Sequence, residues 1–325
     1  MQPIGITMGD AAGIGPEIIA AAWNEIVQKH GSRFIIYGNP EIMNRAVKYT
    51  GGTAARLNEA VISCGNNDAA DVPPGTVDAR AGEAAYQAII RAVDDAKAGK
   101  TAAVVTAPIH KEALNLAGYH YPGHTEILAE RCGIRDFAMM LYLGTVGKYG
   151  LAVDHVTLHC SMKSVFEQIT VENVLTKIRL VNDFMRKIRY NGQDGVNSAV
   201  PKIGICSLNP HNGENGLFGR EELDIINPAA VKARAEGIDV DNSKPADTIM
   251  IDAKNGKYDA VVAMFHDQGH IALKLLGMYR AVNVALGLPI IRTSPAHGTA
   301  FDIAGKGQAN CEGFIEAVNV AVKLI

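Results

Sequence analysis

The sequence has little of what marks secreted, membrane-spanning or nucleic-acid-binding proteins. Its five cysteines, an odd number without CxxC spacing, indicate reduced cytosolic thiols rather than a disulfide framework or a zinc knuckle: Cys64, Cys132, Cys160, Cys206 and Cys311. No apolar run approaches the length of a membrane span, and the N-terminal MQPIGITMGD has neither the charged nor the apolar region of a signal peptide. The net charge of -3 gives no basic footprint for nucleic acid or a membrane surface. We therefore expect a cytoplasmic protein that binds neither.

The chain is 48% hydrophobic and 20% charged, as in ordinary globular proteins, and 325 residues favour two α/β lobes. Apolar runs predict buried strands that alternate with amphipathic helices, which indicates βαβ units and a mostly parallel sheet. The predicted strands cover residues 4–8, 34–38, 102–108, 203–208 and 260–265, with a hairpin of 138–144 and 151–159. The predicted helices cover residues 17–28, 82–99, 170–188, 220–236 with a break at Pro228, and 312–324.

Two polar bursts and one Gly-rich turn mark candidate ligand sites. HDQGH follows the predicted strand 260–265 directly, at the strand end where open α/β sheets bind ligands. HGTAFDIAGKG has three glycines around an Asp and a Lys, which suits either a nucleotide-binding loop or a Gly-rich surface turn. GDAAGIGPE, with Pro16 and Glu17 at a helix start, would place helix amides beside glycines and favour an anion.

Three histidines each follow a predicted buried strand, namely His159, His211 and His266. If those strands are parallel neighbours, the three imidazoles converge at one edge of the sheet. Three histidine nitrogens leave coordination positions open for substrate, as catalytic divalent-metal sites do. The alternative is that the histidines bind substrate oxygens or cap loops without a metal.

Several polar residues lie within apolar sequence after His266: Lys274, Asn283 and Arg292. Cations in such a setting indicate an anionic ligand, a phosphate or a carboxylate, although each could also be a solvated surface cation. His124 and Thr125, in YPGHTE, offer further donors. Asp247 and Asp267 are candidate general bases or orienting carboxylates, with a purely structural role as the alternative.

Together the motifs GDAAGIGPE, YPGHTE, LNPHNGENGLFG, PADT, MFHDQGHIALK, VNVALGLPIIRTS and HGTAFDIAGKG resemble the 4-hydroxythreonine-4-phosphate dehydrogenase family. The resemblance implies a two-lobed isocitrate/isopropylmalate dehydrogenase-like α/β fold with the active site in the cleft between lobes. Residues 1–130 and 287–325 would form the cofactor-side lobe, and residues 131–286 the metal-binding and dimerisation lobe. It also implies a homodimer with its active site at the subunit interface, and a role in pyridoxine biosynthesis.

The same resemblance implies roles for individual residues. One divalent ion per subunit (Zn, Mg, Co or Mn) would be held by His159, His211 and His266. The substrate would be bound by His124, Thr125, Lys274, Asn283 and Arg292, and catalysis would involve Asp247, Asp267 and Lys274. The last motif is similar to the adenosine-binding loop of isopropylmalate and isocitrate dehydrogenases, which implies NAD or NADP contacts from Gly298, Thr299, Ala300, Asp302 and Gly305.

The expected function is metal-dependent, NAD(P)-linked oxidation of a 4-phosphorylated hydroxy acid to a β-keto acid, followed by decarboxylation. The sequence departs from the family pattern at Ala11, where Pro is common, and at Ala296, where an acid is usual. LNPHNGENGLFG and YPGHTE are closer to a branch that acts on 4-phosphorylated threonate or erythronate. VDHVTLH is similar to terephthalate cis-dihydrodiol dehydrogenases, which is one alternative. A two-lobed solute-binding protein and a metal hydrolase are others.

Overall fold

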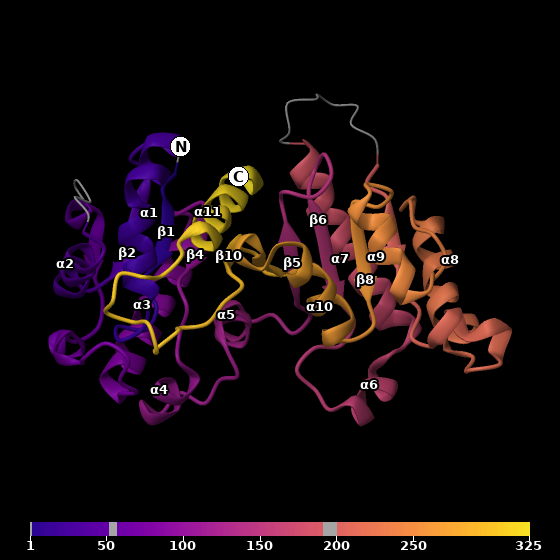
Figure 1. The fold of residues 1–325 in the computed structure, drawn as a ribbon, viewed down its shortest axis with the longest axis horizontal. Helices are drawn as coiled ribbons and strands as arrows, with labels where there is room; N and C mark the ends of the chain where they lie inside the picture. Colours follow the sequence, from indigo (N-terminus) through magenta and orange to yellow (C-terminus); the bar gives the residue numbers. More distant parts are fainter. Residues whose placement is uncertain (1, 52–56, 191–199) are drawn as a thin grey trace. The chain divides into compact units, whose positions relative to one another are not determined.

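The structure is a computed structural model that describes residues 2–51, 57–190 and 200–325. It divides into two compact units (Figure 1). The first comprises Met1–Phe137 and Leu288–Lys323, and the second comprises Ala138–Gly287. The sequence-based boundaries fall after residues 130 and 286, whereas the units of the structure change after residues 137 and 287.

In its described residues, the first unit has five strands in the order β3-β2-β1-β4-β10, and the pairings among them are parallel. The strands are β1 (Ile4–Thr7), β2 (Phe34–Gly38), β3 (Val61–Ser63), β4 (Ala103–Thr106) and β10 (Arg292–Pro295). β1 and β4 are fully buried, as apolar runs predict for strands covered on both faces, and β10 is fully buried although its sequence, RTSP, is polar. Thr7 is in register with Thr106, and Arg292 with Val104.

Helices flank this sheet: α1 (Gly15–His30), α2 (Pro40–Tyr49), α3 (Ala79–Lys97), α4 (Lys111–Leu116), α5 (His124–Cys132) and α11 (Glu312–Leu324), with short 3-10 turns η1 (Asn58–Ala60) and η2 (Asn67–Asp71). Their starts follow the local sequence. Pro16 lies in the first turn of α1, and the side chain of Asn39 accepts hydrogen bonds from the amides of Glu41 and Ile42 at the start of α2.

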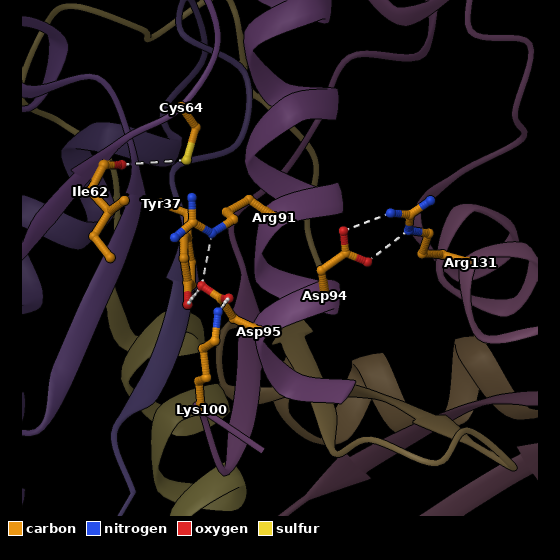
Figure 2. A network of polar contacts seen from close by, with 8 residues as sticks. All are labelled: Tyr37, Ile62, Cys64, Arg91, Asp94, Asp95, Lys100 and Arg131. Carbon is orange, nitrogen blue, oxygen red and sulfur yellow. Dashed lines mark hydrogen bonds and ion pairs between the residues drawn. The ribbon is translucent and has the colours of Figure 1, made fainter. Parts of the chain in front are cut away.

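A buried carboxylate ties β2 to α3 (Figure 2). The Tyr37 hydroxyl donates to Asp95 Oδ2 over 3.0 Å, and Arg91 and Lys100 each pair with Asp95 at 2.9 Å. Gly5 on the neighbouring strand leaves room for the tyrosine ring, since a Cβ there would lie 2.8 Å from Tyr37 Cε2. One aspartate thus holds a strand, a helix and the turn after that helix together.

The described part of the second unit has five strands in the order β9-β5-β6-β8-β7: β5 (Ala138–Leu143), β6 (Leu151–His155), β7 (Ile203–Ile205), β8 (Ala260–Ala263) and β9 (Val282–Leu286). β5 pairs antiparallel with both β6 and β9, whereas β6–β8 and β8–β7 are parallel. The predicted hairpin is therefore confirmed, but its second strand ends at His155 rather than at residue 159. The fold class, a mostly parallel α/β arrangement with flanking helices, is confirmed.

The helices of this unit are α6 (Met162–Gln168), α7 (Val171–Tyr190), α8 (Asn227–Ala235), α9 (Ala246–Lys254) and α10 (His266–Gly277), with turns η3 (Pro210–Gly216), η4 (Glu222–Ile226) and η5 (Met278–Arg280). The predicted helix 220–236 with a break at Pro228 is confirmed in outline. A π-helical turn, η4, is followed by α8, because Pro228 suits the first turn of a new helix better than the interior of an old one. None of the helices in the described ranges is long and apolar enough to cross a membrane.

Candidate active site

Strands β6, β8 and β7 are parallel neighbours, as the three-histidine hypothesis requires. His155, the last residue of β6, is in register with Ala263, the last residue of β8. His266 follows β8 after two residues and begins α10. The carboxyl ends of β6 and β8 therefore present histidines side by side at one edge of this sheet.

Three side chains surround the ring of His266. Its Nδ1 lies 2.7 Å from Asp267 Oδ1, and its ring stacks on His270 with centroids 3.8 Å apart and an interplanar angle of 13°. The ring of His159 lies 5.9 Å away, centroid to centroid. With Nδ1 engaged by a carboxylate, Nε2 of His266 is the nitrogen left for a ligand, an arrangement common among metal-binding histidines.

His155 is a residue that the sequence reasoning missed. It is fully buried, and its Nε2 lies 3.1 Å from Nδ1 of His270. Its ring centroid is 6.4 Å from that of His266, so it is nearly as close as His159. Burial, followed by the neighbouring histidines, lowers the pKa of His155 well below its usual value, and similar causes lower the pKa of His270 to about 4. Both imidazoles are neutral at pH 7.

A glycine allows α10 to lie this close to β6. A Cβ at Gly269 would be 2.4 Å from Nε2 of His155 and 2.7 Å from Cγ1 of Val153. Real Cβ atoms do not approach other atoms so closely, so the helix could not keep its place with a larger residue. The Gly in HDQGH is therefore a packing requirement of the histidine cluster.

His211 lies in an unusual left-handed turn. His211, Asn212, Glu214 and Asn215 all have positive φ, between 44° and 58°, as does Gly213 between them with a φ of 76°. Nδ1 of His211 is 3.3 Å from Glu214, and its ring packs near Phe218. Non-glycine residues adopt this conformation rarely, and clusters of them mark functional segments.

The turn is anchored by a buried glutamate from the following segment. Glu222 is 1% exposed, and its Oε1 accepts the amides of Leu208 and Asn209, each at 2.8 Å. A Cβ at Gly213 would be 2.6 Å from Oε2 of the same carboxylate. The structure shows no ring contact between His211 and the other histidines among the described residues, so it brings His159 and His266 together but not all three.

These residues suit a divalent ion chemically, since neutral imidazoles are its preferred nitrogen ligands and His266 already has an orienting carboxylate. These donor side chains do not lie close together at one point in the structure, however. Within the described residues, no three His, Cys, Asp or Glu side chains are placed so that they could hold a metal ion. His155 has to be added to the candidate ligands beside His159, His211 and His266.

In the first unit, Arg292 is a buried cation without a carboxylate. It is 2% exposed, and its Nε and Nη2 both donate to Thr106 Oγ1, at 3.1 and 2.7 Å. No ion pair joins Arg292 to any residue in the described part of the chain. Burial lowers the pKa of the guanidinium to about 10, with Glu126 acting weakly in the opposite direction. The group is thus still charged at pH 7.

His124 and Thr125 lie at the start of α5, and the charge of Arg292 reaches His124. The helix begins after Gly123, and no side-chain cap takes up its first amides. Nε2 of His124 is buried and has no hydrogen-bond partner among the described residues. Burial, then the charge of Arg292, lowers the pKa of His124 well below its usual value. Thr125 is 6% exposed.

The remaining predicted residues of the second unit differ in setting. Lys274 lies on α10, about two turns beyond His266, where its charge contributes to the lowered pKa of His270. Asn283 is on β9, and its Oδ1 is buried without a partner among the described residues. Asp247 is exposed in the first turn of α9, and it makes no ion pair with a histidine in the described ranges.

The glycine-rich loop of residues 297–307 packs against the N-terminal motif. Ile14 donates its amide to Thr299 O at 3.0 Å, and a Cβ at Gly13 would be 3.0 Å from Cβ of Thr299. Ala300 has a φ of 43°. Residues 10–20 are all buried, so the amides at the start of α1 are covered and not open to an anion as the sequence suggested.

Part of this loop has room for a ligand. Gly298 has open space where a Cβ would be, and Asp302 is exposed. Nε2 of His297 is buried and has no hydrogen-bond partner in the described part of the chain. An orphaned ring nitrogen, an exposed carboxylate and a bare backbone within one loop are groups that suit the hydroxyl groups and adenine of a nucleotide.

The fold and these groups define an α/β protein with a buried arginine bonded to Thr106 in one unit and a histidine cluster in the other. Comparison with isocitrate dehydrogenase from Methylococcus capsulatus, at a TM-score of 0.51 and 14% identity over 99% of this chain and 88% of that one, confirms the dehydrogenase-like fold.

Residues 30–321 match the family of the pyridoxal phosphate biosynthetic protein PdxA, and the chain belongs to that family. It is 42% identical to the 4-hydroxythreonine-4-phosphate dehydrogenase of Beijerinckia indica, over 99% of this chain and 95% of the relative. It is 41% identical to the D-threonate 4-phosphate dehydrogenase of Salmonella typhimurium, over 99% of both. The structure of 4-hydroxythreonine-4-phosphate dehydrogenase from Klebsiella pneumoniae superimposes with a TM-score of 0.82 at 38% identity, over 100% of this chain and 99% of that one.

Proposed function

We propose that this protein is a dehydrogenase that oxidises a 4-phosphorylated hydroxy acid with NAD or NADP and a divalent metal ion. The substrate is 4-hydroxy-L-threonine 4-phosphate, D-threonate 4-phosphate or D-erythronate 4-phosphate. The first two are the substrates in the names of its relatives. Oxidation gives a ketone β to the carboxylate, and the product then loses CO2. The observation that carries the phosphorylated substrate is the buried, carboxylate-free guanidinium of Arg292.

A buried cation costs several kcal/mol unless an anion compensates it. Thr106 supplies Arg292 with a single acceptor oxygen, which leaves guanidinium N–H groups for a ligand. A phosphate has three oxygens to share among Arg292, the uncapped start of α5 and Thr125. A backbone hydrogen bond to Ala107 occupies one ring nitrogen of the neutral His124, so its orphaned Nε2 carries the lone pair and can accept a hydrogen bond from a protonated phosphate oxygen or a substrate hydroxyl without adding a second buried charge.

When bound, NAD or NADP would accept the hydride, and a divalent ion would lower the pKa of the reacting hydroxyl. His266, His211 and either His159 or His155 would hold the ion, and Gly298, Thr299, Ala300, Asp302 and Gly305 would hold the cofactor. The chemistry of these side chains and the membership of the family support both the divalent ion and the nicotinamide cofactor.

The remaining residues position groups and move protons. Asp267 keeps Nδ1 of His266 engaged and so presents its Nε2. Lys274 Nζ is suited to deliver a proton to the carbon that CO2 leaves, and Asn283 Oδ1 to accept from a substrate hydroxyl or amine. Asp247, exposed on α9, is the candidate that accepts the hydroxyl proton.

We also propose a homodimer formed through α10 and η5. Four large apolar side chains there are exposed: Ile271 (57%) and Leu275 (83%), four residues apart on α10, and Met278 (53%) and Tyr279 (65%) in the η5 turn that follows. A monomer rarely exposes such a stripe, whereas a second copy of the chain would bury it.

The function is tested by following NADH absorbance with each of the three phosphorylated acids, their dephosphorylated forms and a cis-dihydrodiol. We expect turnover of a phosphorylated acid, dependence on NAD or NADP, and release of CO2. Equal efficiency with the dephosphorylated acid, or turnover only of the dihydrodiol, would contradict the phosphate assignment. Hydrolysis without any cofactor would point to a metal hydrolase.

The metal is tested by prolonged chelation, which should abolish turnover until a divalent ion is restored. The content of bound divalent metal per subunit should fall in His211→Ala and His266→Ala, and comparison of His155→Ala with His159→Ala identifies the remaining ligand. Full activity and no bound metal in the chelated protein would exclude a metal-dependent reaction.

A further inference from the structure

Glu17 joins the N-terminal motif to the glycine-rich loop near the other end of the chain. It lies in the first turn of α1 and is 3% exposed. Its Oε1 accepts the amide of Gly305 at 2.5 Å, and its Oε2 accepts the amide of Gly307 at 2.9 Å. Both carboxylate oxygens are therefore used to hold one short segment of backbone.

The loop is shaped to make these two bonds. Gly305 and Gly307 have φ values of 80° and 63°, which turn their amides in a way that other residues adopt only with strain. A Cβ at Gly307 would be 2.1 Å from Tyr49 O, and one at Gly305 would be 2.8 Å from Pro74 Cβ. The glycines are required both by conformation and by the closeness of the backbone to its neighbours.

The part of the loop proposed to meet the cofactor lies between two anchors. On one side, Thr299 O accepts the amide of Ile14; on the other, Gly305 and Gly307 are held by Glu17. Between them, Ala300 is in the left-handed region, which costs about 1–3 kcal/mol and persists only where the surroundings impose it. Asp302 is exposed in the same interval.

We propose that Glu17 is a positioning residue for the nicotinamide cofactor. Its carboxylate fixes the loop in the conformation that presents Asp302 and the bare backbone at Gly298, without itself touching the ligand. The start of α1 is therefore a clamp for the cofactor loop. This inference rests on the proposed function, because it takes residues 298–305 as the cofactor segment.

The test is Glu17→Gln. A glutamine has one acceptor oxygen and one NH2 group, so it can accept only one of the two amides and turns a donor toward the other. We expect hydrogen exchange in the peptide containing Gly305 and Gly307 to become faster. We expect the Kd for NADH, measured by fluorescence titration, to rise about tenfold or more, as for a lost bond to a charged group. The KM for the phosphorylated acid should stay within about twofold, because the substitution does not change the residues proposed to bind that substrate.

Glu25→Gln is the matched control, because it removes the same charge from an exposed position of the same helix. It should change neither exchange in the loop nor the Kd for NADH. If Glu17→Gln folds poorly, Glu17→Asp keeps the charge on a shorter side chain that cannot span both amides, and should give a smaller effect in the same direction.

Three results would overturn the proposal. Unchanged exchange at Gly305 and Gly307 in Glu17→Gln would show that the carboxylate does not hold the loop. Equal weakening of NADH and of the phosphorylated acid, together with a lower Tm, would show a general structural role only. Faster loop exchange with an unchanged Kd for NADH would also contradict the proposal, because it would show that the cofactor does not depend on this loop. The dehydrogenase activity itself is tested separately, by the NADH absorbance assay.

Discussion

At the scale of single residues, Arg292 provides the most direct test of the substrate. Arg292→Met removes the buried cation but keeps an apolar side chain of similar length. We expect kcat/KM for the phosphorylated acid to fall at least about tenfold for each charge-assisted bond lost. Residual turnover of the dephosphorylated acid should hardly change, because it lacks the group that Arg292 binds.

The control for this experiment is Arg220→Met, in which the lost arginine is exposed and pairs with Asp224. It should leave both substrates unaffected. An equal loss on both compounds in Arg292→Met would indicate that the arginine stabilises the fold rather than binding phosphate. In that case the measured stability of the variant should fall together with its activity.

The contribution of Asp10 to stability should change with pH in the opposite direction to that of most carboxylates. It is fully buried, its Oδ1 accepts the Ala12 amide at 2.9 Å, and its Oδ2 has no hydrogen-bond partner among the described residues. Burial raises its pKa from 3.8 to about 6, with the Ala12 amide opposing the shift. Because the folded protein holds this proton more tightly than the unfolded chain, stability is lost as pH rises from 3.8 to about 6.

Asp10→Asn should therefore raise the free energy of unfolding at pH 8 by up to about 2–3 kcal/mol, since each pKa unit corresponds to about 1.4 kcal/mol. The gain should vanish below about pH 4, where the aspartate is protonated in both states. Denaturant titrations at pH 4 and pH 8 measure it. A loss of stability at pH 8, or a gain independent of pH, would contradict the assignment.

Residue types and motif order nominated the candidate site residues, but they could not indicate which histidine of VDHVTLH faces His266. Two histidines four residues apart both follow an apolar run, and only the end of β6 at His155 distinguishes them. The pairing of His155 with His270 depends on how closely α10 approaches β6, which Gly269 permits and no local pattern reveals. Glu17 was interpreted as a helix-start residue because its partners are 288 and 290 positions away.

At the scale of elements, strands were predicted well where both faces are buried, because a short continuous apolar run between turn residues is typical of a strand in the interior of a parallel sheet. β1, β2, β4 and β8 all fall within their predicted ranges. The turn at His211 could not be predicted in the same way. Asn and Gly in NPHNGENG indicate a turn, but its left-handed run depends on the buried carboxylate of Glu222, which arrives from a later segment.

The tie between β2 and α3 can be tested with two neighbouring aspartates (Figure 2). Burial raises the pKa of Asp95, but the bonds from Lys100, Arg91 and Tyr37 outweigh it and lower the pKa overall. Asp95→Asn leaves these donors with a weaker acceptor, so it should cost about 1–3 kcal/mol in the free energy of unfolding at pH 7. The cost should shrink as pH falls through the pKa of Asp95, because the wild-type carboxylate is then protonated.

Asp94→Asn is the matched control, since Asp94 is the adjacent residue and its pair with Arg131 is exposed, with side chains 41% and 46% accessible. Exposed pairs contribute at most about 1 kcal/mol, so this substitution should have a small effect. Urea denaturation of the two variants at pH 7 gives the comparison. Equal effects would show that the network around Asp95 does not join the strand to the helix.

At the scale of the whole molecule, the proposed homodimer makes a prediction about α10. Leu275, 83% exposed in the single chain, is the most exposed large apolar residue of this helix, and burying it against a second copy would contribute about 1.5–3 kcal/mol per subunit. Leu275→Glu places a charge in that contact and should convert the dimer to a monomer in sedimentation equilibrium at micromolar concentration, with unfolding of the monomer otherwise little changed.

Ile251→Glu, on the exposed side of α9 at 59% accessibility, is the control and should leave the assembly intact. If the active site borrows residues across the interface, the Leu275→Glu monomer should lose turnover while retaining NADH binding. A wild-type protein that sediments as a fully active monomer would exclude the dimer.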